Sequence, residues 1–393
     1  MNNTPIAERL HIGFFGARNA GKSSLVNAVT SQELSVVSDT LGTTTDPVYK
    51  SMELLPLGPV TIIDTPGFDD IGELGEKRVI KTKQVLNKTD IAILVSNAEN
   101  GLSACDKELI SLFEEKNISY IIVYNKADLL SEVPKNGENS LYVSTVSMLG
   151  IEELKNKIGL IRPKNEKNIR IIGDFIKEGD TVVLVTPIDS AAPKGRLILP
   201  QQQTIRDILD SHATAFVCQD NELSNTLNSL KNPPSLVVCD SQVFKKVSES
   251  VPENIPLTSF SILFARYKGL LDAALIGAEY IDKLKDGDTV LISEGCTHHR
   301  QCDDIGTVKL PKWLKEYTKK ELKFEFTSGG GFPDNLSRYA LIIHCGGCML
   351  PDREIMYRQK CSSDQNVPIT NYGTAIAHMN GILKRSTEIL RTI

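Results

Sequence analysis

One short motif limits the folds open to this chain more than any other feature of its sequence. Residues 16–23 read Gly-Ala-Arg-Asn-Ala-Gly-Lys-Ser and fit the pattern G-x-x-x-x-G-K-[ST]. The motif follows a short apolar run, His11–Phe15, and opens a segment with helical periodicity. A glycine loop between a buried strand and a helix lets backbone amides surround phosphate groups. The sequence therefore predicts a phosphate-binding loop in a domain built on a parallel sheet.

Apolar runs of strand length recur through the first part of the chain. Val60–Ile63, Ile91–Val95 and Tyr120–Tyr124 are continuous, as expected of buried parallel strands, and helix-period segments lie between them. This alternation predicts a doubly wound α/β domain over residues 1–165. The polar, proline-containing stretch 162–167 is predicted to be a linker.

A weak internal repeat follows the predicted linker. Residues 177–185 and 285–293 share the pattern Lys-x-Gly-Asp-Thr-Val at an offset of 108 residues. We therefore expect two smaller parallel-sheet α/β units of related topology, over residues 166–265 and 266–393. The alternative is that strands after a Gly-Asp turn resemble one another by chance.

Three further motifs each follow a predicted strand and complete a nucleotide site. Asp64 of Asp-Thr-Pro-Gly can hold a Mg²⁺ ion, and Asp128 of Asn-Lys-Ala-Asp can accept hydrogen bonds from guanine N1–H and the 2-amino group. Adenine lacks that donor pair, so the motifs predict a P-loop GTPase domain that binds GTP and Mg²⁺. Lys22 is expected to reach the β- and γ-phosphates, and Ser23 to join Asp64 on Mg²⁺. The predicted nucleotide-binding residues are Gly16, Asn19, Gly21, Lys22, Ser23, Ser24, Asp64, Gly67, Asn125, Lys126, Asp128, Ser144 and Thr145.

This stretch, roughly residues 10–160, resembles the translation-factor-like small GTPases. Asn19 in the phosphate loop and the segment Ser38–Asp46 are similar to the Gly-Thr-Thr-x-Asp switch of the potassium-activated GTPases that modify tRNA wobble uridine. The resemblance implies that Asn19 contacts K⁺, which supplies the charge of an arginine finger, and that Thr44 contacts Mg²⁺. The alternative is that Asn19 is an ordinary turn residue.

The residue after Asp-x-x-Gly is Phe68, where a glutamine would orient the attacking water. A phenylalanine cannot do so, and we expect slow hydrolysis or a substitute residue. Glu73 and Glu76 follow in the sequence and are candidates, although acids at a solvated helix start are an equal explanation. The predicted catalytic set is Lys22, Thr44 and Glu76.

Cysteines and histidines gather in two places near the end of the chain. The sequence reads Cys296-Thr-His298-His299 and later His344-Cys345-Gly-Gly-Cys348, each after a predicted strand. Loops at the carboxyl ends of parallel strands share one crevice, so the three thiolates can converge. Three cysteines would leave one iron of a cubane with an exchangeable ligand, whereas a Cys₃His zinc site is the alternative. Candidates for the fourth position are His298, Cys302, Asp303, His344 and an exogenous ligand.

The joint pattern of a GTPase followed by Cys-x-His and His-Cys-x-x-Cys resembles HydF, the GTPase maturases of [FeFe]-hydrogenase, over the whole chain. The resemblance implies a [4Fe–4S] cluster on Cys296, Cys345 and Cys348, with His298 and His344 in the same motif. It implies a scaffold or carrier that receives a di-iron precursor from two radical S-adenosylmethionine maturases and delivers it to apo-[FeFe]-hydrogenase. It also implies a dimerising middle unit, a homodimer or higher oligomer, and GTP control of partner contacts.

Composition limits the competing functions. Lys plus Arg is 44 against 49 Asp plus Glu, for a net charge of −5, and aromatic residues are 6%. Nucleic-acid partners are therefore unfavoured, because RNA readers use basic grooves and stacking aromatics. Residues 1–10 lack a signal-peptide pattern and no apolar run could span a bilayer, so we expect a cytoplasmic protein without membrane contact. The alternatives left open are a potassium-activated tRNA- or rRNA-related GTPase with a structural zinc site, and a zinc-stabilised switch without chemistry.

Overall fold

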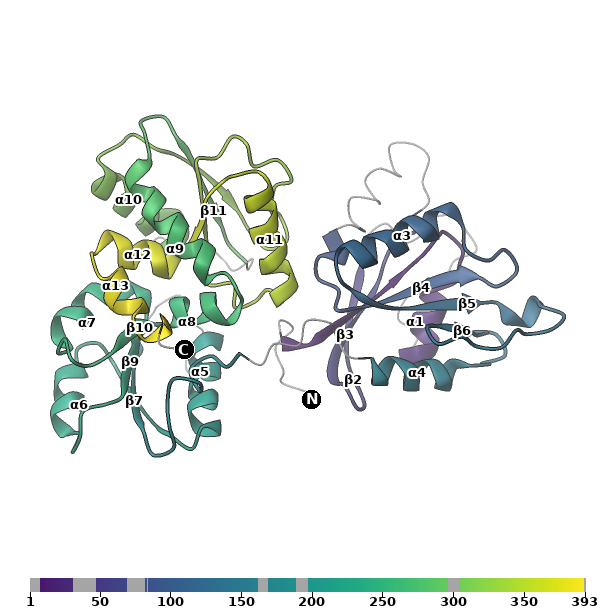
Figure 1. The fold of residues 1–393 in the computed structure, drawn as a ribbon, viewed down its shortest axis with the longest axis horizontal. Coiled ribbons are helices and arrows are strands. Elements are labelled where there is room, and N and C mark those ends of the chain that lie inside the picture. The colour runs from purple at the N-terminus through teal and green to yellow at the C-terminus, as the bar shows by residue number, and fades with distance from the viewer. Residues whose placement is uncertain are drawn as a thin grey trace. The chain divides into compact units, whose positions relative to one another are not determined.

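A computed structural model describes residues 8–30, 47–68, 82, 84–161, 169–188, 197–295 and 304–391 (Figure 1). Contacts between residues divide the chain into two compact units, Met1–Lys167 and Asn168–Ile393. In the described residues, no helix combines the length and the apolar character that crossing a membrane requires.

The first unit is a six-stranded sheet with the order β2-β3-β1-β4-β5-β6. All neighbouring strands are parallel except β2, which pairs antiparallel with β3. The predicted parallel sheet is confirmed, and the antiparallel edge strand is an addition that the apolar pattern did not predict. Its strands are β1 (Leu10–Phe15), β2 (Val48–Leu54), β3 (Gly58–Asp64), β4 (Ile91–Asn97), β5 (Ser119–Asn125) and β6 (Ser140–Tyr142); its helices are α1 (Lys22–Thr30), α3 (Ala104–Glu115), η2 (Ala127–Leu129) and α4 (Ile151–Leu160).

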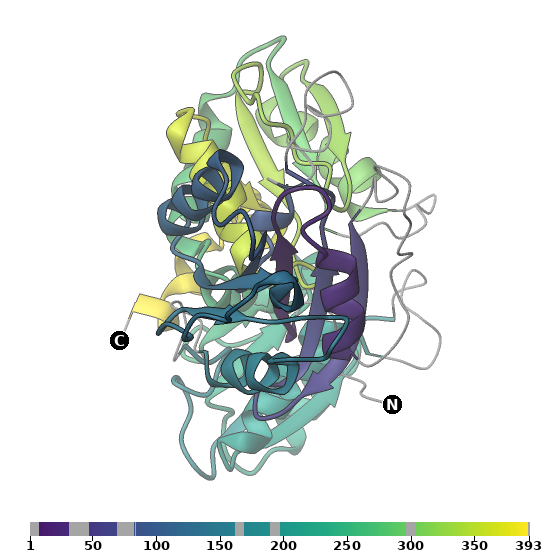
Figure 2. The same cartoon turned by 90° about the vertical axis from the view of Figure 1, so that its right-hand side faces the viewer.

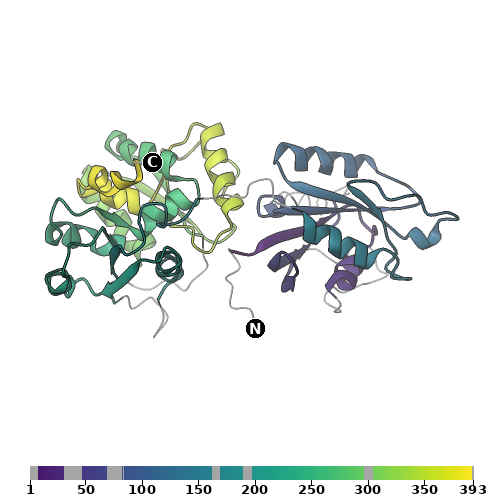
Figure 3. The ribbon, with the colours of Figure 1, turned by 60° about the horizontal axis from the view of Figure 1, so that its bottom comes forward.

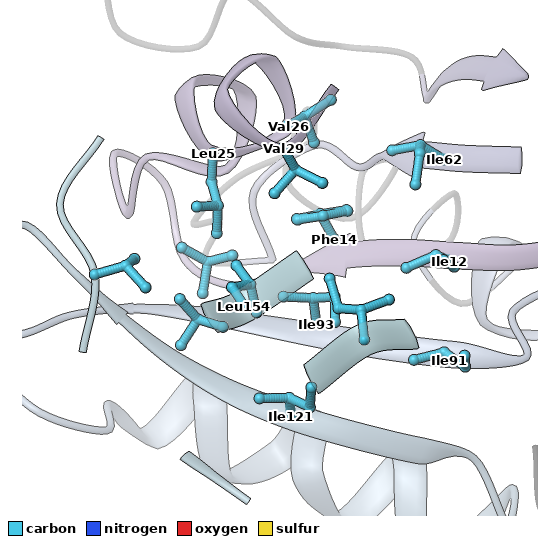
Figure 4. Close-up of a cluster of buried hydrophobic side chains, with 14 of the residues drawn as sticks. Ile12, Phe14, Leu25, Val26, Val29, Ile62, Ile91, Ile93, Ile121 and Leu154 are labelled. Atoms are coloured by element: carbon cyan, nitrogen blue, oxygen red, sulfur yellow. The ribbon is translucent and has the colours of Figure 1, made fainter. Parts of the chain in front are cut away.

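Helices cover both faces of this sheet, which explains why its central strands are apolar throughout. On one face, strand side chains such as Phe14 and Ile93 pack against Leu25 of α1 and Leu154 of α4 (Figure 4). Figure 2 shows α1 alongside the strands of this unit. On the opposite face, Phe113 of α3 is buried among the alternate strand residues. The three layers hold the strand ends in fixed positions.

The second unit contains two four-stranded sheets in which every strand pairing is parallel. The first sheet belongs to β7 (Thr181–Val185), α5 (Leu199–Asp210), β8 (Thr214–Cys218), α6 (Leu223–Ser229), β9 (Leu236–Cys239), η3 (Ser241–Val243), α7 (Phe244–Ser250), β10 (Leu257–Ser259) and α8 (Phe260–Tyr267). The second belongs to α9 (Leu271–Glu279), η4 (Tyr280–Lys283), β11 (Thr289–Ser293), η5 (Ile305–Lys309), α10 (Leu310–Thr318), β12 (Lys323–Thr327), β13 (Leu341–His344), α11 (Asp352–Asp364), β14 (Ile369–Asn371), α12 (Tyr372–Met379), α13 (Leu383–Thr387) and η6 (Ile389–Arg391).

The two sheets have the same topology, which confirms the predicted repeat. The first sheet has the order β10-β9-β7-β8, and the second has the order β14-β13-β11-β12 when written in the same direction. Their registers also agree, since Thr181 pairs with Thr214 and Thr289 pairs with Lys323. In both sheets the second and third strands lie on opposite sides of the first. Open α/β sheets with this arrangement generally bind ligands at the carboxyl ends of the strands, where the strand order reverses.

The end of the chain returns to the first of these two sheets. Helix α13 contacts β10, and Leu390 packs with the buried residues on both faces of that sheet. Helix α12 contacts α8, so the two repeats share a packed interface (Figure 3). The predicted domain division at residue 265 stays a prediction. Helix α13 and Leu390 follow this residue in the sequence but pack against the sheet that precedes it.

Candidate functional site

The nucleotide motifs meet at the carboxyl edge of the first sheet. The Asn125 side-chain amide donates to the carbonyl of Ala20 at 3.1 Å, although the two residues lie far apart in the sequence. Gly21 follows Ala20 and has φ +89°. A Cβ built on Gly21 would lie 2.2 Å from Asn125 Nδ2. The phosphate loop therefore needs glycine at this position, because a side chain would displace the guanine motif.

The phosphate-loop lysine and serine already have partners within the site. Lys22 is buried and donates from Nζ to the carbonyls of Gly16 at 3.0 Å and Ala17 at 2.7 Å. The hydroxyl of Ser23 donates to Asp64 at 2.6 Å. These are the groups predicted to receive phosphate oxygens and Mg²⁺. The structure brings them together at the ends of β1 and β3, as their motifs predict.

The guanine motif is fixed by a serine from the next strand loop. The Ser144 hydroxyl donates to the Asp128 carboxylate, and it accepts from the backbone amide of Ser147 at 3.1 Å. Ser144 is fully buried, whereas Asp128 is exposed toward solvent. Lys126 has left-handed backbone geometry with φ 64°. Ser144 therefore positions the carboxylate, and Thr145 lies beside it, half-buried.

The remaining predicted nucleotide residues differ in their exposure to solvent. Asn19 is exposed and left-handed, with φ 59°. Phe68 is 4% exposed and packs in the core with Phe15 and Phe113, while its backbone amide donates to Gly16 at 3.2 Å. The Phe68 ring is therefore a core residue and leaves no side chain to orient water. Gly67 is buried just after the end of β3, Ser24 is half-buried in α1, and Thr44, Glu73 and Glu76 lie outside the described residues.

The second candidate site lies where β11 and β13 end side by side. The backbone amide of Cys345 donates to the Ser293 carbonyl at 2.9 Å. The hydrogen bonding between the two strands therefore continues one residue beyond their last pair, Ser293 and His344. Two backbone amides then point at the Cys345 sulfur: that of Gly295 at 3.0 Å and that of Gly347 at 3.4 Å. Gly347 has φ +64°, so glycine allows the tight turn. Amide donors around a sulfur stabilise its thiolate form and are a usual surrounding of metal-bound sulfur.

Both thiols of the His-Cys-Gly-Gly-Cys segment are held in the protonated form by their surroundings. Burial raises the pKa of Cys345, against the opposing effect of the two backbone amides. Burial, and then the neighbouring Cys345, raise the pKa of Cys348 to about 11. Lys268, itself 5% exposed, partly offsets this rise and donates to the Leu350 carbonyl at 2.9 Å. A metal ion that replaced the protons would supply the missing positive charge.

His344 is buried with both ring nitrogens in hydrogen bonds. Its Nδ1 lies 2.7 Å from the Cys345 carbonyl oxygen, and its Nε2 lies 2.9 Å from the Arg358 guanidinium. Burial, and then the charge of Arg358, lower the pKa of His344 to about 3. The ring is therefore neutral at physiological pH.

The other half of the predicted metal site, Cys296, His298, Cys302 and Asp303, lies outside the described residues. Within the described ranges, no group of three His, Cys, Asp or Glu side chains could hold a metal ion. The cysteine pair and its amide donors fit one side of a thiolate-bound group.

Sequence reasoning missed four buried charged residues around these loops: Glu294, Glu354, Arg358 and Lys268. Glu294 lies at the end of β11 and accepts from the Tyr372 hydroxyl at 3.4 Å. Arg358 follows Glu354 at the spacing of an ordinary surface ion pair on a helix. No local pattern marks that pair as buried, so only the packing reveals it.

Comparison with curated proteins finds GTPases that are similar to part of the chain. The chain is 35% identical over 188 residues to the tRNA modification GTPase MnmE of Thermoanaerobacter sp. (strain X514), covering 46% of this chain and 38% of that protein. It is 33% identical over 181 residues to GTPase Der of Kosmotoga olearia, covering 41% of each. The chain thus spans less than half the length of these relatives. Among solved structures, it is similar to a variant of Aquifex aeolicus Era bound to GDP·AlF₄⁻, with a TM-score of 0.34, 18% identity, and coverage of 53% of this chain and 91% of that chain.

Family models divide the chain into three consecutive regions. A 50S ribosome-binding GTPase model matches residues 11–126. The hydrogen maturase F dimerization domain matches residues 171–269, and the hydrogen maturase F tetramerization domain matches residues 273–389. The two maturase models together cover more than half of the chain and divide between the two repeated sheets. With a GTPase domain in front of both, the chain belongs to the hydrogen maturase F (HydF) family.

Proposed function

We propose that this protein is a GTP-hydrolysing maturation factor that carries a [4Fe–4S] cluster and delivers a di-iron precursor to apo-[FeFe]-hydrogenase. The observation that carries the proposal is the pair of backbone amides on the Cys345 sulfur, at the strand ends where the Cys-x-x-Cys segment begins. Cys345 and Cys348, with Cys296, would hold the cluster. A cluster held by three thiolates supplies one iron whose remaining ligand can be exchanged, as a carrier requires.

The first unit would bind GTP with Mg²⁺. Ser23 and Asp64 already meet at 2.6 Å, and an ion between them would be joined by Thr44. Lys22 would turn from the loop carbonyls to the phosphates, and Asp128 would read guanine. K⁺ at the exposed Asn19 would supply charge during hydrolysis, with Glu76 as the candidate for positioning water.

Two copies of the chain would associate through the open edge of the first repeated sheet. Strand β8 reads Thr-Ala-Phe-Val-Cys, and two adjacent residues within it, Phe216 and Val217, are 41% and 47% exposed. Adjacent strand residues point to opposite faces, so both faces are apolar at this edge. The equivalent edge strand β12 carries Lys323 and Glu325, charges that discourage strand addition. The edge at β8 is therefore the one suited to a second copy, in agreement with the dimerization-domain match.

The partners in this proposal are two radical S-adenosylmethionine maturases, which build the precursor, and the apo-hydrogenase. GTP binding would control these contacts. The reducing cytoplasm suits the proposal because thiolates stay available there.

Anaerobic reconstitution with iron and sulfide tests the cluster. We expect absorbance near ~400 nm, a reduced-state EPR signal and about four irons per chain. Cys345→Ser should lose all three, whereas Cys361→Ser, a cysteine of the neighbouring helix α11, should keep them. A colourless protein with about one zinc per chain would refute the cluster and favour a structural Cys₃His site.

The alternative of a potassium-activated tRNA- or rRNA-related GTPase rests on the MnmE likeness, which covers 46% of the chain. Hydrogenase activation separates the two. Purified protein preloaded with the precursor should activate apo-hydrogenase, and Cys345→Ser protein should not. Tight tRNA binding at physiological salt, without activation, would favour the alternative.

A further inference from the structure

Arg358 joins the ends of three strands of the second repeated sheet. Its side chain lies on α11 and is 1% exposed. The guanidinium donates to His344 Nε2 at 2.9 Å, to the Ser293 hydroxyl at 3.1 Å and to the Gly329 carbonyl at 2.6 Å. Ser293 ends β11, His344 ends β13, and Gly329 follows β12. Glu354 balances the charge by accepting at 2.9 Å.

These contacts fix the proton of the His344 ring. A guanidinium can only donate hydrogen bonds, so Nε2 must accept with its lone pair. A carbonyl oxygen can only accept, so the proton must sit on Nδ1, which lies 2.7 Å from the Cys345 carbonyl. His344 is thus a neutral ring with both nitrogens engaged. No lone pair is left to bind iron or zinc.

We propose that Arg358 and His344 form a fixed hydrogen-bonded pair that orients Cys345, and that His344 is a positioning residue excluded from the metal-ligand set. The inference deepens the proposed function, because Cys345 is one of the thiolates assigned to the cluster. Three successive contacts link Arg358 to the Cys345 sulfur. Arg358 orients the His344 ring, the ring donates to the Cys345 carbonyl, and this carbonyl precedes the loop whose Gly347 amide points at the Cys345 sulfur.

The Arg358–His344 pair is buried, so its hydrogen bonds are costly to lose. Arg358 is also stacked 5.1 Å from the centre of the Phe332 ring, and Glu354 is 3% exposed. Removal of the guanidinium would leave the buried His344 Nε2 and Glu354 carboxylate without their donor. His344 would then be free to change tautomer and to turn its Nε2 toward a metal.

The first experiment uses the full-length, metal-free protein with ¹⁵N-labelled histidine. Two-bond ¹H–¹⁵N spectra report which ring nitrogen carries the proton, and His344→Gln identifies the resonance. We expect protonated Nδ1 and unprotonated Nε2 in the native protein. This pattern should be lost in Arg358→Met and kept in Arg338→Met, a matched exposed arginine of the same unit. A proton on Nε2 of His344, or a pattern unchanged by Arg358→Met, would overturn the inference. If Arg358→Met does not fold, the tautomer of His344 in the native protein decides between the two outcomes.

The second experiment uses the reconstituted protein. If His344 is outside the ligand set, nitrogen couplings in pulsed EPR spectra of the reduced cluster should be the same in native and His344→Gln protein. A strongly coupled nitrogen that disappears in His344→Gln would make His344 a ligand and overturn the proposal. Failure of native protein to take up any cluster would instead refute the proposed function. The tautomer of His344 in the metal-free protein would then be the only test of the Arg358–His344 pair.

Discussion

The backbone amide of Gly295 lies 3.0 Å from the sulfur of Cys345, so β11 and β13 contribute to the same sulfur site. Residues 296–303 begin directly after this contact and carry the other predicted thiolate, Cys296. The contact therefore brings Gly295, the residue before the first cysteine segment, to the sulfur of the second segment. It supports the prediction that the two cysteine segments form one site.

The raised pKa values of these thiols predict slow alkylation in the metal-free protein. A pKa of about 11 at Cys348, against an ordinary value of 9, leaves ~100-fold less thiolate at pH 7.5, and the thiolate is the nucleophile. We expect iodoacetamide to modify Cys348 about 100-fold more slowly than free glutathione, as measured by peptide mass spectrometry. A rate equal to that of glutathione would contradict the burial of this thiol.

The low pKa of His344 predicts a particular dependence of stability on pH. Its folded-state value of about 3 lies below the ordinary 6.5, so the unfolded chain binds more protons between these two values. Stability from this group is therefore present above pH 6.5 and is lost as the pH falls toward 3. Between pH 6.5 and 5.5, metal-free native protein should lose about 1 kcal/mol more unfolding free energy than His344→Gln. Urea denaturation at the two pH values measures this, and parallel losses would contradict it.

Gly21→Ala should weaken GTP binding at least ~10-fold, because left-handed backbone costs a non-glycine residue about 1–2 kcal/mol and the new Cβ would press on Asn125. Gly58→Ala is the matched control: Gly58 also has a positive φ, +79°, but nothing lies within 4 Å of its Cβ position. The control should lose stability and keep GTP affinity. Equal losses of affinity in both variants would show that backbone strain, rather than contact with Asn125, is the cause.

Asp128→Asn should lower GTP affinity about 100-fold, since it removes a charged acceptor of the guanine donors, a change of about 3 kcal/mol. The same variant should gain affinity for xanthosine nucleotides, whose 2-oxo group accepts from the new amide. Isothermal titration with both nucleotides measures the exchange. Glu132→Gln, an exposed carboxylate in the same loop, should bind GTP normally. Unchanged nucleotide preference in Asp128→Asn would mean that guanine is read elsewhere.

Phe216→Lys should convert the proposed dimer to a monomer, because a charge on an edge strand discourages the addition of a second strand. Light scattering after size-exclusion chromatography reports the mass. Phe326→Lys on β12 is the control, at 37% exposure against 41% for Phe216. It should leave the dimer intact. Dissociation by the control alone would assign the dimer to the second repeated sheet.

The sequence by itself determined the P-loop domain, the strands that carry its motifs and the relatedness of the two repeats. These features are local: a glycine loop after an apolar strand, or a Gly-Asp turn before one, needs only neighbouring residues to be recognised. The pattern that predicts Cys345 and Cys348 as metal ligands is local in the same sense. These two ligands, and those expected in residues 296–303, stay predictions.

Only the tertiary structure decided which side chains surround those motifs. Nothing local distinguishes Arg358 and Glu354 from an exposed helical ion pair, yet folding buries both and aims the guanidinium at His344. The return of α13 to β10 likewise depends on contacts between distant segments. The physical reason is the same throughout: a buried polar group must find its partner, and the fold decides which distant residue supplies it.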